Sequence, residues 1–598
     1  MPATYNAPVR DTAFVLETVV GLEKLAALPR FADATPDVVR AILEEGGRFA
    51  EEILHPLNAV GDREGCTRHA DGSVTTPKGF RKAYQSFIEG GWNTLIADRA
   101  FGGQALPFVV GVAFDEYVSS ANMAFGMYPG LTKGAIPALV FGGSEELKAR
   151  YLPHLVSGRW TATMNLTEPH AGTDLGLLRT RATPNADGSW AITGSKIFIS
   201  AGEHDLAENI VHLVLAKTPG APDNSKGISL FVVPKFLANA DGSLGACNEV
   251  SCDALEHKMG IHGNATCAMN YDGATGWLIG EEMRGLQIMF VMMNMARLGV
   301  AVQGMAQAEI ATQNAARYAR ERLQGRALSG PKAPDEPADP IIVHPDVRRM
   351  LLNAKAFNEG ARALMLWVAL QADLAEGATD ASEREVAGDL LALLTPVIKA
   401  YFTDEGYTHA TAAQQVFGGH GYIVETGMEQ FVRDARIAMI YEGANGVQAM
   451  DLVGRKLAQN GGRALRTFLG IVKANIDDSA AGTPLRTHAD DLQGATGKLQ
   501  GATMWLMQHG LSNPDEAGAA AMPYLRLMAL VAMGHMWLTM AKGAAEQLAG
   551  TDVDRQFLEA KLITARHFFT RRLPEASALA REISAGGAAL MELPADAF

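Results

Sequence analysis

The sequence predicts a mainly α-helical protein with a β domain in its middle. Apolar residues recur at helical spacing towards both ends of the chain, whereas short β-branched runs bounded by turn residues occupy about residues 160–280. The 598 residues are enough for about three or four domains. We therefore expect four parts, residues 1–159, 160–283, 284–462 and 463–598.

The first part is expected to be helical. Thr35-Pro36-Asp37 is a typical helix start, with a capping hydroxyl followed by a proline at the first helical position. Apolar residues then recur at helical spacing as far as Leu54, and Pro56 is expected to end this helix. Further helices are expected at residues 78–89, 109–119 and 144–155.

The second part has the pattern of a β domain. Asp187-Gly188 separates two short extended runs, residues 178–183 and 189–193, which is typical of a β-hairpin. Residues 210–215 and 228–233 are β-branched and bounded by prolines and glycines, so we expect two more strands there.

The third and fourth parts return to long helical segments. In the third part they are expected at residues 287–322, 345–376, 383–402, 409–417 and 444–459, and in the fourth at 488–510, 523–548 and 553–582. The apolar run 527–541 is shorter than the roughly 18 residues that a membrane-spanning helix needs, so we expect a buried helix there.

Composition excludes several classes of protein. Acidic residues outnumber basic ones, 66 to 52, and the resulting net charge of −14 disfavours general nucleic-acid binding. Four cysteines are too few for a disulfide scaffold, and the chain contains no Cys-x-x-Cys pair that would indicate a metal site. With no secretory signal visible, we expect a cytoplasmic protein without membrane insertion.

Three segments carry candidate chemistry. Residues 164–174 combine hydroxyls, small side chains and backbone NH groups that suit a pyrophosphate or the edge of a flavin. In residues 194–202 an aromatic residue stands two positions before a hydroxyl on an expected strand. Residues 415–445 contain consecutive glycines and then Glu442, a carboxylate that could be desolvated, which would raise its pKa towards that of a general base. Taken singly, each segment is more typical of an ordinary turn, strand or helix cap.

In this combination and order the segments resemble the acyl-CoA dehydrogenase family. The resemblance rests on Thr-Glu-Pro-x-Ala-Gly at residues 167–172, Gln-x-Phe-Gly-Gly-x-Gly at 415–421 and Tyr-Glu-Gly at 441–443, and it covers nearly the whole chain. It implies a helical domain, a β-barrel domain and a four-helix bundle, followed here by an additional C-terminal helical domain. The long subgroup with that addition includes 3-methylmercaptopropionyl-CoA dehydrogenases of dimethylsulfoniopropionate breakdown and also enzymes for ordinary fatty acyl-CoAs.

The resemblance also implies the chemistry. Family members use FAD to dehydrogenate an acyl-CoA between its α and β carbons, and Glu442 matches the base that removes the α-proton. The flavin and its pyrophosphate are expected to contact Met164, Leu166, Thr167, Gly172, Thr173, Phe198 and Ser200. Arg322, Gln415 and Gly419 are expected to contact FAD bound mainly by a neighbouring subunit, which implies a homodimer. Substrate contacts are expected from Arg297, Tyr441 and Gly443, and no metal is expected.

Substrate, electron acceptor and enzymatic role leave alternatives open. A short- or medium-chain acyl-CoA, with 3-(methylthio)propanoyl-CoA as a specific candidate, stands beside a long-chain fatty acyl-CoA. Met292, Met293 and Met295 are on the helix expected near the acyl pocket and could accept a substrate sulfur, although a methionine-rich core explains them as well. Electrons are expected to pass to an electron-transfer flavoprotein, or to oxygen in an acyl-CoA oxidase. A non-enzymatic relative that binds nucleic acid or a partner is disfavoured by Glu442 and the acidic composition.

Overall fold

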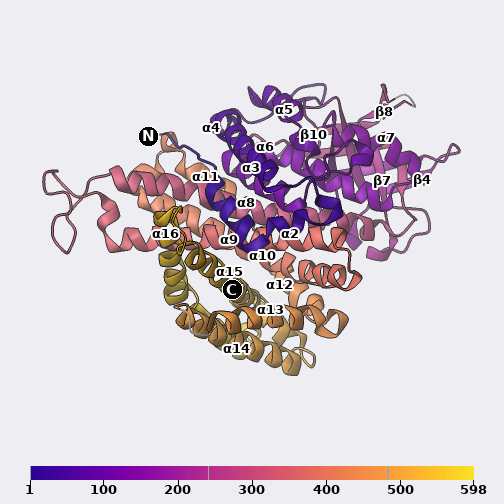
Figure 1. Cartoon of the computed structure of the whole chain (residues 1–598). Coiled ribbons are helices and arrows are strands. Elements are labelled where there is room, and N and C mark those ends of the chain that lie inside the picture. The colour runs from indigo at the N-terminus through magenta and orange to yellow at the C-terminus, as the bar shows by residue number, and fades with distance from the viewer. Residues whose placement is uncertain (1, 240–241, 481–483) are drawn as a thin grey trace. The chain divides into compact units, whose positions relative to one another are not determined.

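The computed structural model describes residues 2–239, 242–480 and 484–598 (Figure 1). The chain forms two compact units. The helical unit comprises Met1–Glu45, Pro107–Glu116 and Val300–Phe598, and the barrel unit comprises Gly46–Leu106 and Tyr117–Gly299. The four parts expected from the sequence stay a prediction.

The helix that starts at Thr35-Pro36 does not end at Pro56. Helix α3 (Pro36–Phe49) is followed by a π-helical turn, η3 (Ala50–Leu54), and then by α4 (His55–Glu64). The His55 NH bonds to the Ala50 carbonyl, five residues back, so the turn is widened by one residue. Pro56 stands in the first turn of α4, where its missing NH costs little. The expected helix end is therefore wrong, because the π-helical turn accommodates the proline.

Of the three further helices expected before the barrel, two agree with the sequence and one is longer. Helices α5 (Phe80–Glu89) and α7 (Glu145–Val156) lie where they were expected. The next helix, α6, was expected to end near residue 119 but runs over Phe108–Gly142. Asn122 has non-helical angles, and its side-chain oxygen accepts a hydrogen bond of 3.0 Å from the Phe125 NH. Asn122 thus caps a second helical stretch in α6, which the sequence analysis missed.

Five strands of the barrel unit close into a ring. The pairings run β11–β5–β4–β6–β7 and back to β11, while β10 extends the sheet beside β11 and β3 beside β6. The Asp187-Gly188 hairpin joins β4 to β5 as expected. The strands are β3 (Trp160–Asn165), β4 (Arg181–Pro184), β5 (Trp190–Ser200), β6 (Asn209–Lys217), β7 (Ile228–Pro234), β10 (Val250–Leu255) and β11 (Thr266–Ile279). The expected β-barrel is confirmed.

Long helices build the helical unit. They are α8 (Gly285–Glu321), α9 (Pro345–Gly377) and α10 (Ala381–Val416), followed by the short α11 (Met428–Ile437) and α12 (Asn445–Asp451). Two separate helices were expected where α10 is continuous. The residues that interrupt the apolar pattern have tertiary roles: Glu405 is buried in ion pairs, and a Cβ on Gly406 would lie 2.2 Å from the Gly304 carbonyl. Gly304 and Gly406 therefore let the backbones of α8 and α10 touch.

The C-terminal helices pack on α9 and α10 within the helical unit. They are α13 (Arg463–Ala480), which the sequence analysis missed, α14 (Arg486–His509), α15 (Pro514–Gln547), α16 (Arg555–His567) and α17 (Glu575–Ser584). The Trp537 indole NH donates to the Ala356 carbonyl of α9 at 3.0 Å. Arg526 and Arg572 pair with the buried Glu405 of α10 at 2.8 and 3.0 Å. Both apolar packing and buried ion pairs hold this block in place.

Among the described residues, three helices, α8, α10 and α15, are long and apolar enough to cross a membrane by length and composition. The length argument made for the apolar run in α15 is therefore wrong, but the buried helix expected there is confirmed. In α10 and α15, 72% of the most apolar window is buried by the rest of the protein, and in α8 the share is 50%. Packing within the protein accounts for much of this apolar surface.

Removing the C-terminal helices after Gly462 should expose the apolar surfaces of α9 and α10 on which these helices pack. Glu405 would also lose Arg526 and Arg572, leaving a buried carboxylate without these counter-ions. We expect a chain that ends at Gly462 to form aggregates or tetramers, measured by size-exclusion chromatography with light scattering beside the full chain. A monodisperse truncated dimer would contradict this expectation and show that the block is an independent appendage.

Candidate active site

Two backbone regions meet where β3 ends in the barrel unit. Met164 is buried and Leu166 is half-buried in the core beside β3. The Ile197 NH donates to the Thr167 carbonyl at 2.9 Å, and the Thr163 hydroxyl donates to the Ser200 carbonyl at 2.6 Å. These bonds hold the segment after β3 beside the end of β5, so the first two sequence motifs lie together.

Glu168 anchors the loop that carries the first motif. Its carboxylate accepts hydrogen bonds from the Arg179 NH, the Thr180 NH and the Thr180 hydroxyl at 2.7, 3.0 and 2.6 Å. The buried Lys196 ammonium lies 2.9 Å from Glu168 and donates to the Leu166 carbonyl at 3.0 Å. Burial alone would raise the pKa of Glu168, but Lys196 and these hydrogen bonds lower it to about 2. Glu168 therefore stays charged and fixes the loop.

The rest of this loop presents an exposed edge. Glu168 and Ala171 exchange backbone hydrogen bonds of 2.9 and 3.0 Å, which turns the chain back on itself. Gly172 and Thr173 follow and are both exposed. Among the described atoms within 4 Å, a Cβ on Gly172 would meet only the Thr167 methyl, at 3.9 Å. Thr167, Gly172 and Thr173 thus lie around open space that a ligand can enter.

Phe198 has two features that are unusual for a strand residue. Its backbone φ is +59°, and the residue is 60% exposed. The register of β5 against β11 shifts between Cys267 and Met269, which marks a bulge beside Phe198. An exposed aromatic on a left-handed backbone is costly, and such strain is concentrated at ligand sites. Phe198 and the half-buried Ser200 therefore fit a planar ligand such as a flavin ring.

Arg297 lies in the barrel unit, at the end of that unit's part of α8. It is buried, donates to the Asn294 side chain at 3.3 Å and lies 5.9 Å from the centre of the Phe290 ring. Met292 is fully buried in the barrel unit's core against Gly134, and Met293 packs on the same core. These contacts explain Met292 and Met293 as core residues.

Glu442 stands in a strained turn of the helical unit, between α11 and α12. Its φ is +56° and that of Gly443 is +84°. The Glu442 side chain is half-buried, whereas the neighbouring Tyr441 donates its hydroxyl to Gln303 on α8. Burial, reinforced by the charge of Glu442, raises the pKa of Tyr441 well above its ordinary value, so this phenol stays protonated. A left-handed glutamate is rare enough to indicate a functional position.

A buried lysine holds this turn. Lys399 on α10 is fully buried and donates to the Gly443 carbonyl at 2.8 Å and to the Asn445 side-chain oxygen at 2.9 Å. Asn445 in turn donates to Thr403 and Asp404 on α10 at 2.9 and 2.7 Å. The Gln448 amide donates to the Glu442 carbonyl at 3.1 Å. Helices α10 and α12 therefore fix the backbone on both sides of the carboxylate.

Arg322, Gln415 and Gly419 are all exposed on the helical unit. Tyr318, one helical turn before Arg322, stacks on Phe417 with ring centres 4.2 Å apart and shares a 2.8 Å hydrogen bond with His420. This contact joins the ends of α8 and α10. A Cβ on Gly419 would meet no described atom within 4 Å, so the chain itself does not demand a glycine there. These three exposed residues are therefore accessible to a ligand from outside the subunit.

The expected site residues thus form two groups. The barrel unit holds Arg297 and all the expected flavin residues of the first two motifs, and the helical unit holds Arg322, Gln415, Gly419, Tyr441, Glu442 and Gly443. Sequence reasoning missed Glu168, Lys196 and Lys399. Glu168 was visible inside a motif but carried no sign of its buried partner, and nothing in the local sequence marks Lys399.

Comparison with known proteins gives four matching family models in consecutive order. "Acyl-CoA dehydrogenase, N-terminal domain" matches residues 37–159 and "Acyl-CoA dehydrogenase, middle domain" matches 163–274. "Acyl-CoA dehydrogenase, C-terminal domain" matches residues 283–457, and "Acetyl-CoA dehydrogenase C-terminal like" matches 468–594.

Two relatives match over nearly their full length. The chain is 45% identical to the 3-methylmercaptopropionyl-CoA dehydrogenase of Ruegeria pomeroyi, over 98% of this chain and 99% of that protein. It is 34% identical to a broad-specificity linear acyl-CoA dehydrogenase of Mycobacterium tuberculosis, over 99% of this chain and 100% of that protein.

Solved structures share the fold at lower sequence identity. ACDH-11 of Caenorhabditis elegans in complex with C11-CoA has a TM-score of 0.79 at 20% identity, covering 96% of this chain and 92% of that one. An acyl-CoA dehydrogenase of Bacillus anthracis complexed with FAD has a TM-score of 0.74 at 20% identity, covering 96% and 91%.

The Glu168–Lys196 pair should stabilise the barrel unit. We expect Glu168→Gln to lower its free energy of unfolding by about 3–5 kcal/mol, because the substitution leaves the buried Lys196 without a counter-ion. Because the folded pKa of Glu168 lies below its ordinary value of 4.5, this contribution is present above that pH and is lost as the pH falls towards 2.

Urea unfolding followed by circular dichroism measures this effect. Glu208→Gln is the matched control, since the Glu208–Arg159 pair is half exposed and should contribute less than about 1 kcal/mol. Equal losses in the two variants would contradict an anchoring role for Glu168.

Proposed function

The chain belongs to the acyl-CoA dehydrogenase family, and from this premise we propose that Glu442 is its catalytic base and 3-(methylthio)propanoyl-CoA its substrate. The general activity follows from the family: an FAD-dependent oxidoreductase that dehydrogenates acyl-CoA thioesters between the α and β carbons. The single observation that carries the substrate proposal is the 45% identity, over 98% of the chain, to a 3-methylmercaptopropionyl-CoA dehydrogenase. That name describes the same thioester.

The turn at Glu442 supports its role as base. An α-proton beside a thioester is weakly acidic, so a carboxylate must be held at a fixed place to remove it. Lys399, Asn445 and Gln448 fix the backbone around Glu442, while its own side chain remains half-buried and able to meet a ligand. Bound FAD supplies the redox chemistry by accepting the β-hydrogen as hydride.

The loop after β3 and the end of β5 support the flavin assignments. We assign the isoalloxazine face to Phe198 and Ser200, and its edge and pyrophosphate to Met164, Leu166, Thr167, Gly172 and Thr173. The exposed aromatic of Phe198 and the open space beside Gly172 fit a planar, phosphate-bearing ligand. We assign the substrate contacts to Arg297, Tyr441 and Gly443.

Assembly is part of the proposal. We assign Arg322, Gln415 and Gly419 to FAD bound mainly by a second subunit, which makes the active enzyme a homodimer. Their exposure, beside the contact that joins the ends of α8 and α10, supports this assignment. We further propose an electron-transfer flavoprotein as electron acceptor. Slow reoxidation of the reduced enzyme in air would favour this acceptor over oxygen.

Replacing the base should stop the chemistry without unfolding the protein. We expect Glu442→Gln to keep FAD but to slow anaerobic flavin reduction by an acyl-CoA by about 10²–10⁴-fold, because the α-proton loses its acceptor. Glu425→Gln, an exposed glutamate in the preceding connection between α10 and α11, is the control. Flavin bleaching at the normal rate in Glu442→Gln would remove this residue from the role.

Substrate preference is tested by comparing kcat/KM for a panel of acyl-CoAs. We expect kcat/KM to be highest for 3-(methylthio)propanoyl-CoA, lower for butanoyl-CoA, and lowest for octanoyl- and palmitoyl-CoA. A tenfold advantage for palmitoyl-CoA would identify a long-chain fatty acyl-CoA dehydrogenase instead, and would leave the role of Glu442 untouched.

Cofactor retention and assembly should change together. We expect Arg322→Ala to weaken FAD binding and to lower the thermal midpoint of the dimer, because FAD binds only the assembled state. Flavin content and light scattering measure the two effects, with the exposed Arg40→Ala on α3 as control. A fully flavinated monomer at micromolar concentration would refute the shared site.

A further inference from the structure

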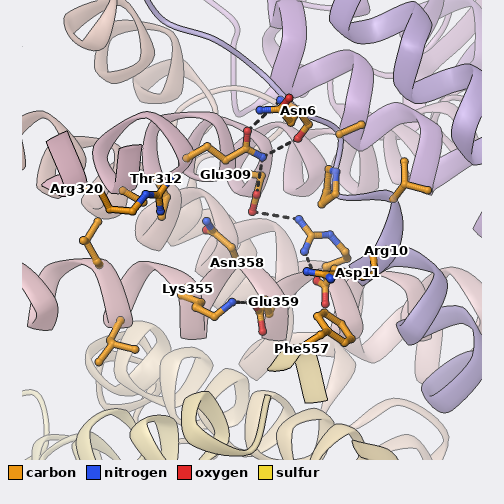
Figure 2. Close-up of a pocket in the computed structure, with 18 of the residues that line it drawn as sticks. Asn6, Arg10, Asp11, Glu309, Thr312, Arg320, Lys355, Asn358, Glu359 and Phe557 are labelled. Atoms are coloured by element: carbon orange, nitrogen blue, oxygen red, sulfur yellow. Dashed lines mark hydrogen bonds and ion pairs between the residues drawn. The ribbon is translucent and has the colours of Figure 1, made fainter. Parts of the chain in front are cut away.

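A cavity of about 590 Å³ lies inside the helical unit, between the N-terminal segment, α8, α9 and α16 (Figure 2). This volume is in the range of sites that enclose most of a small organic molecule. Among the described residues that line it, none is one that we assign to FAD or to the acyl-CoA. Arg320 lines the cavity, whereas Arg322, which follows the end of α8 and which we assign to FAD, does not.

One end of the cavity is closed by an ion-pair network. Arg362 is buried, and its guanidinium donates to Glu116 at 3.0 Å and to Glu309 at 3.1 Å and also pairs with Asp11. Lys561 pairs with Asp11 and, at 2.8 Å, with Glu359. Because these side chains neutralise one another in ion pairs, we assign this end of the cavity a structural role.

Asn358, in the middle of the cavity wall, differs from its neighbours. Only 3% of the residue is exposed, yet its side-chain oxygen has no hydrogen-bond partner in the part of the chain that the structure describes. Figure 2 shows the side chain of Asn358 on α9 pointing towards α8, below Glu309. A buried amide oxygen without a partner is unfavourable, and a hydrogen-bond donor in the cavity would satisfy it.

Two arginines stand at the other end, where α8 finishes and α9 begins. Arg320 and Arg348 both line the cavity and are exposed. Neither guanidinium makes an ion pair or hydrogen bond with any other described residue. Arg348 precedes Asn358 by ten residues on α9, which is about 15 Å along the helix. The arginines at this end and Asn358 in the middle of the wall are therefore well separated along an elongated space.

The wall between them is apolar. Ala316 of α8, Ile342 and the adjacent Leu351 and Leu352 of α9 line the cavity, and each is only partly buried by the protein. Five basic and three acidic side chains line the whole cavity, although the chain carries a net charge of −14. The local excess of positive charge favours an anion.

We propose that this cavity is a second ligand site, which takes an elongated organic anion. A carboxylate or phosphate head binds Arg320 and Arg348, an aliphatic body lies along Leu351 and Leu352, and a hydroxyl or amine at the far end donates to Asn358. Guanidinium groups bind either head through paired, charge-assisted hydrogen bonds. The proposal is independent of the substrate assigned above, because it uses none of the residues of that site.

Isothermal titration of the FAD-loaded full chain tests the site. The probes are ω-hydroxydecanoate, decanoate, decyl phosphate and the neutral decanediol. We expect saturable binding of the anions, tightest for the hydroxy acid among the carboxylates, and none of the diol. A tighter complex with decyl phosphate than with decanoate identifies a phosphate head, and the reverse identifies a carboxylate.

Variants place the binding in this cavity. Combined Arg320→Ala and Arg348→Ala should weaken the binding of every anion by about tenfold or more. Asn358→Leu should remove only the advantage of the hydroxy acid. The control is Arg349→Ala, which removes a neighbouring exposed arginine that pairs with Asp346 and does not line the cavity. Dehydrogenase activity should stay unchanged in all of them.

Three results would overturn the proposal: wild-type affinity in the double arginine variant, equal binding of the diol and the acid, or no binding of any probe at millimolar concentration. The arginines are exposed, so their replacement is compatible with folding.

Discussion

The buried ammonium of Lys399 is the interaction on which the proposed active site depends. Glu442 and Gly443 both have left-handed backbones, which is costly for a glutamate. Lys399 offsets this cost by binding the Gly443 carbonyl and the Asn445 side chain, and Asn445 ties the turn to α10. The carboxylate of Glu442 can remain half-buried and open to a ligand because Lys399 and Asn445 stabilise the turn.

A buried lysine has a similar role in the barrel unit. Lys196 is buried beside Glu168 and also binds the Leu166 carbonyl, so a charged pair inside the core fixes a loop whose outer edge stays open. Breaking such pairs is expensive because each leaves a charge without solvent or counter-ion. In both units a buried lysine donates to a backbone carbonyl next to a residue that we assign to the ligand. A buried lysine thus stabilises both the loop that we assign to the flavin edge and the turn that carries the base.

Much of the fold could be predicted from local patterns. The hairpin at Asp187-Gly188, the β-branched strands and the helix start at Thr35-Pro36 depend on near neighbours in the sequence, and the order of the motifs indicated the family. Features that depend on contacts between residues far apart in the sequence could not be predicted from these patterns. Gly406 and Glu405 interrupt the apolar pattern of α10 because they meet Gly304 and two C-terminal arginines. Lys399 and Asn358 have no local signature, since their roles exist only in the folded chain.

Single-turnover flavin reduction in Lys399→Met tests the central claim most directly. Methionine is close to lysine in length but cannot donate to Gly443 or Asn445. We predict that the variant retains FAD and folds, yet reduces its flavin with bound acyl-CoA about 10²-fold more slowly, because the carboxylate of Glu442 loses its position. Flavin reduction at the wild-type rate in a fully flavinated Lys399→Met enzyme would contradict the account.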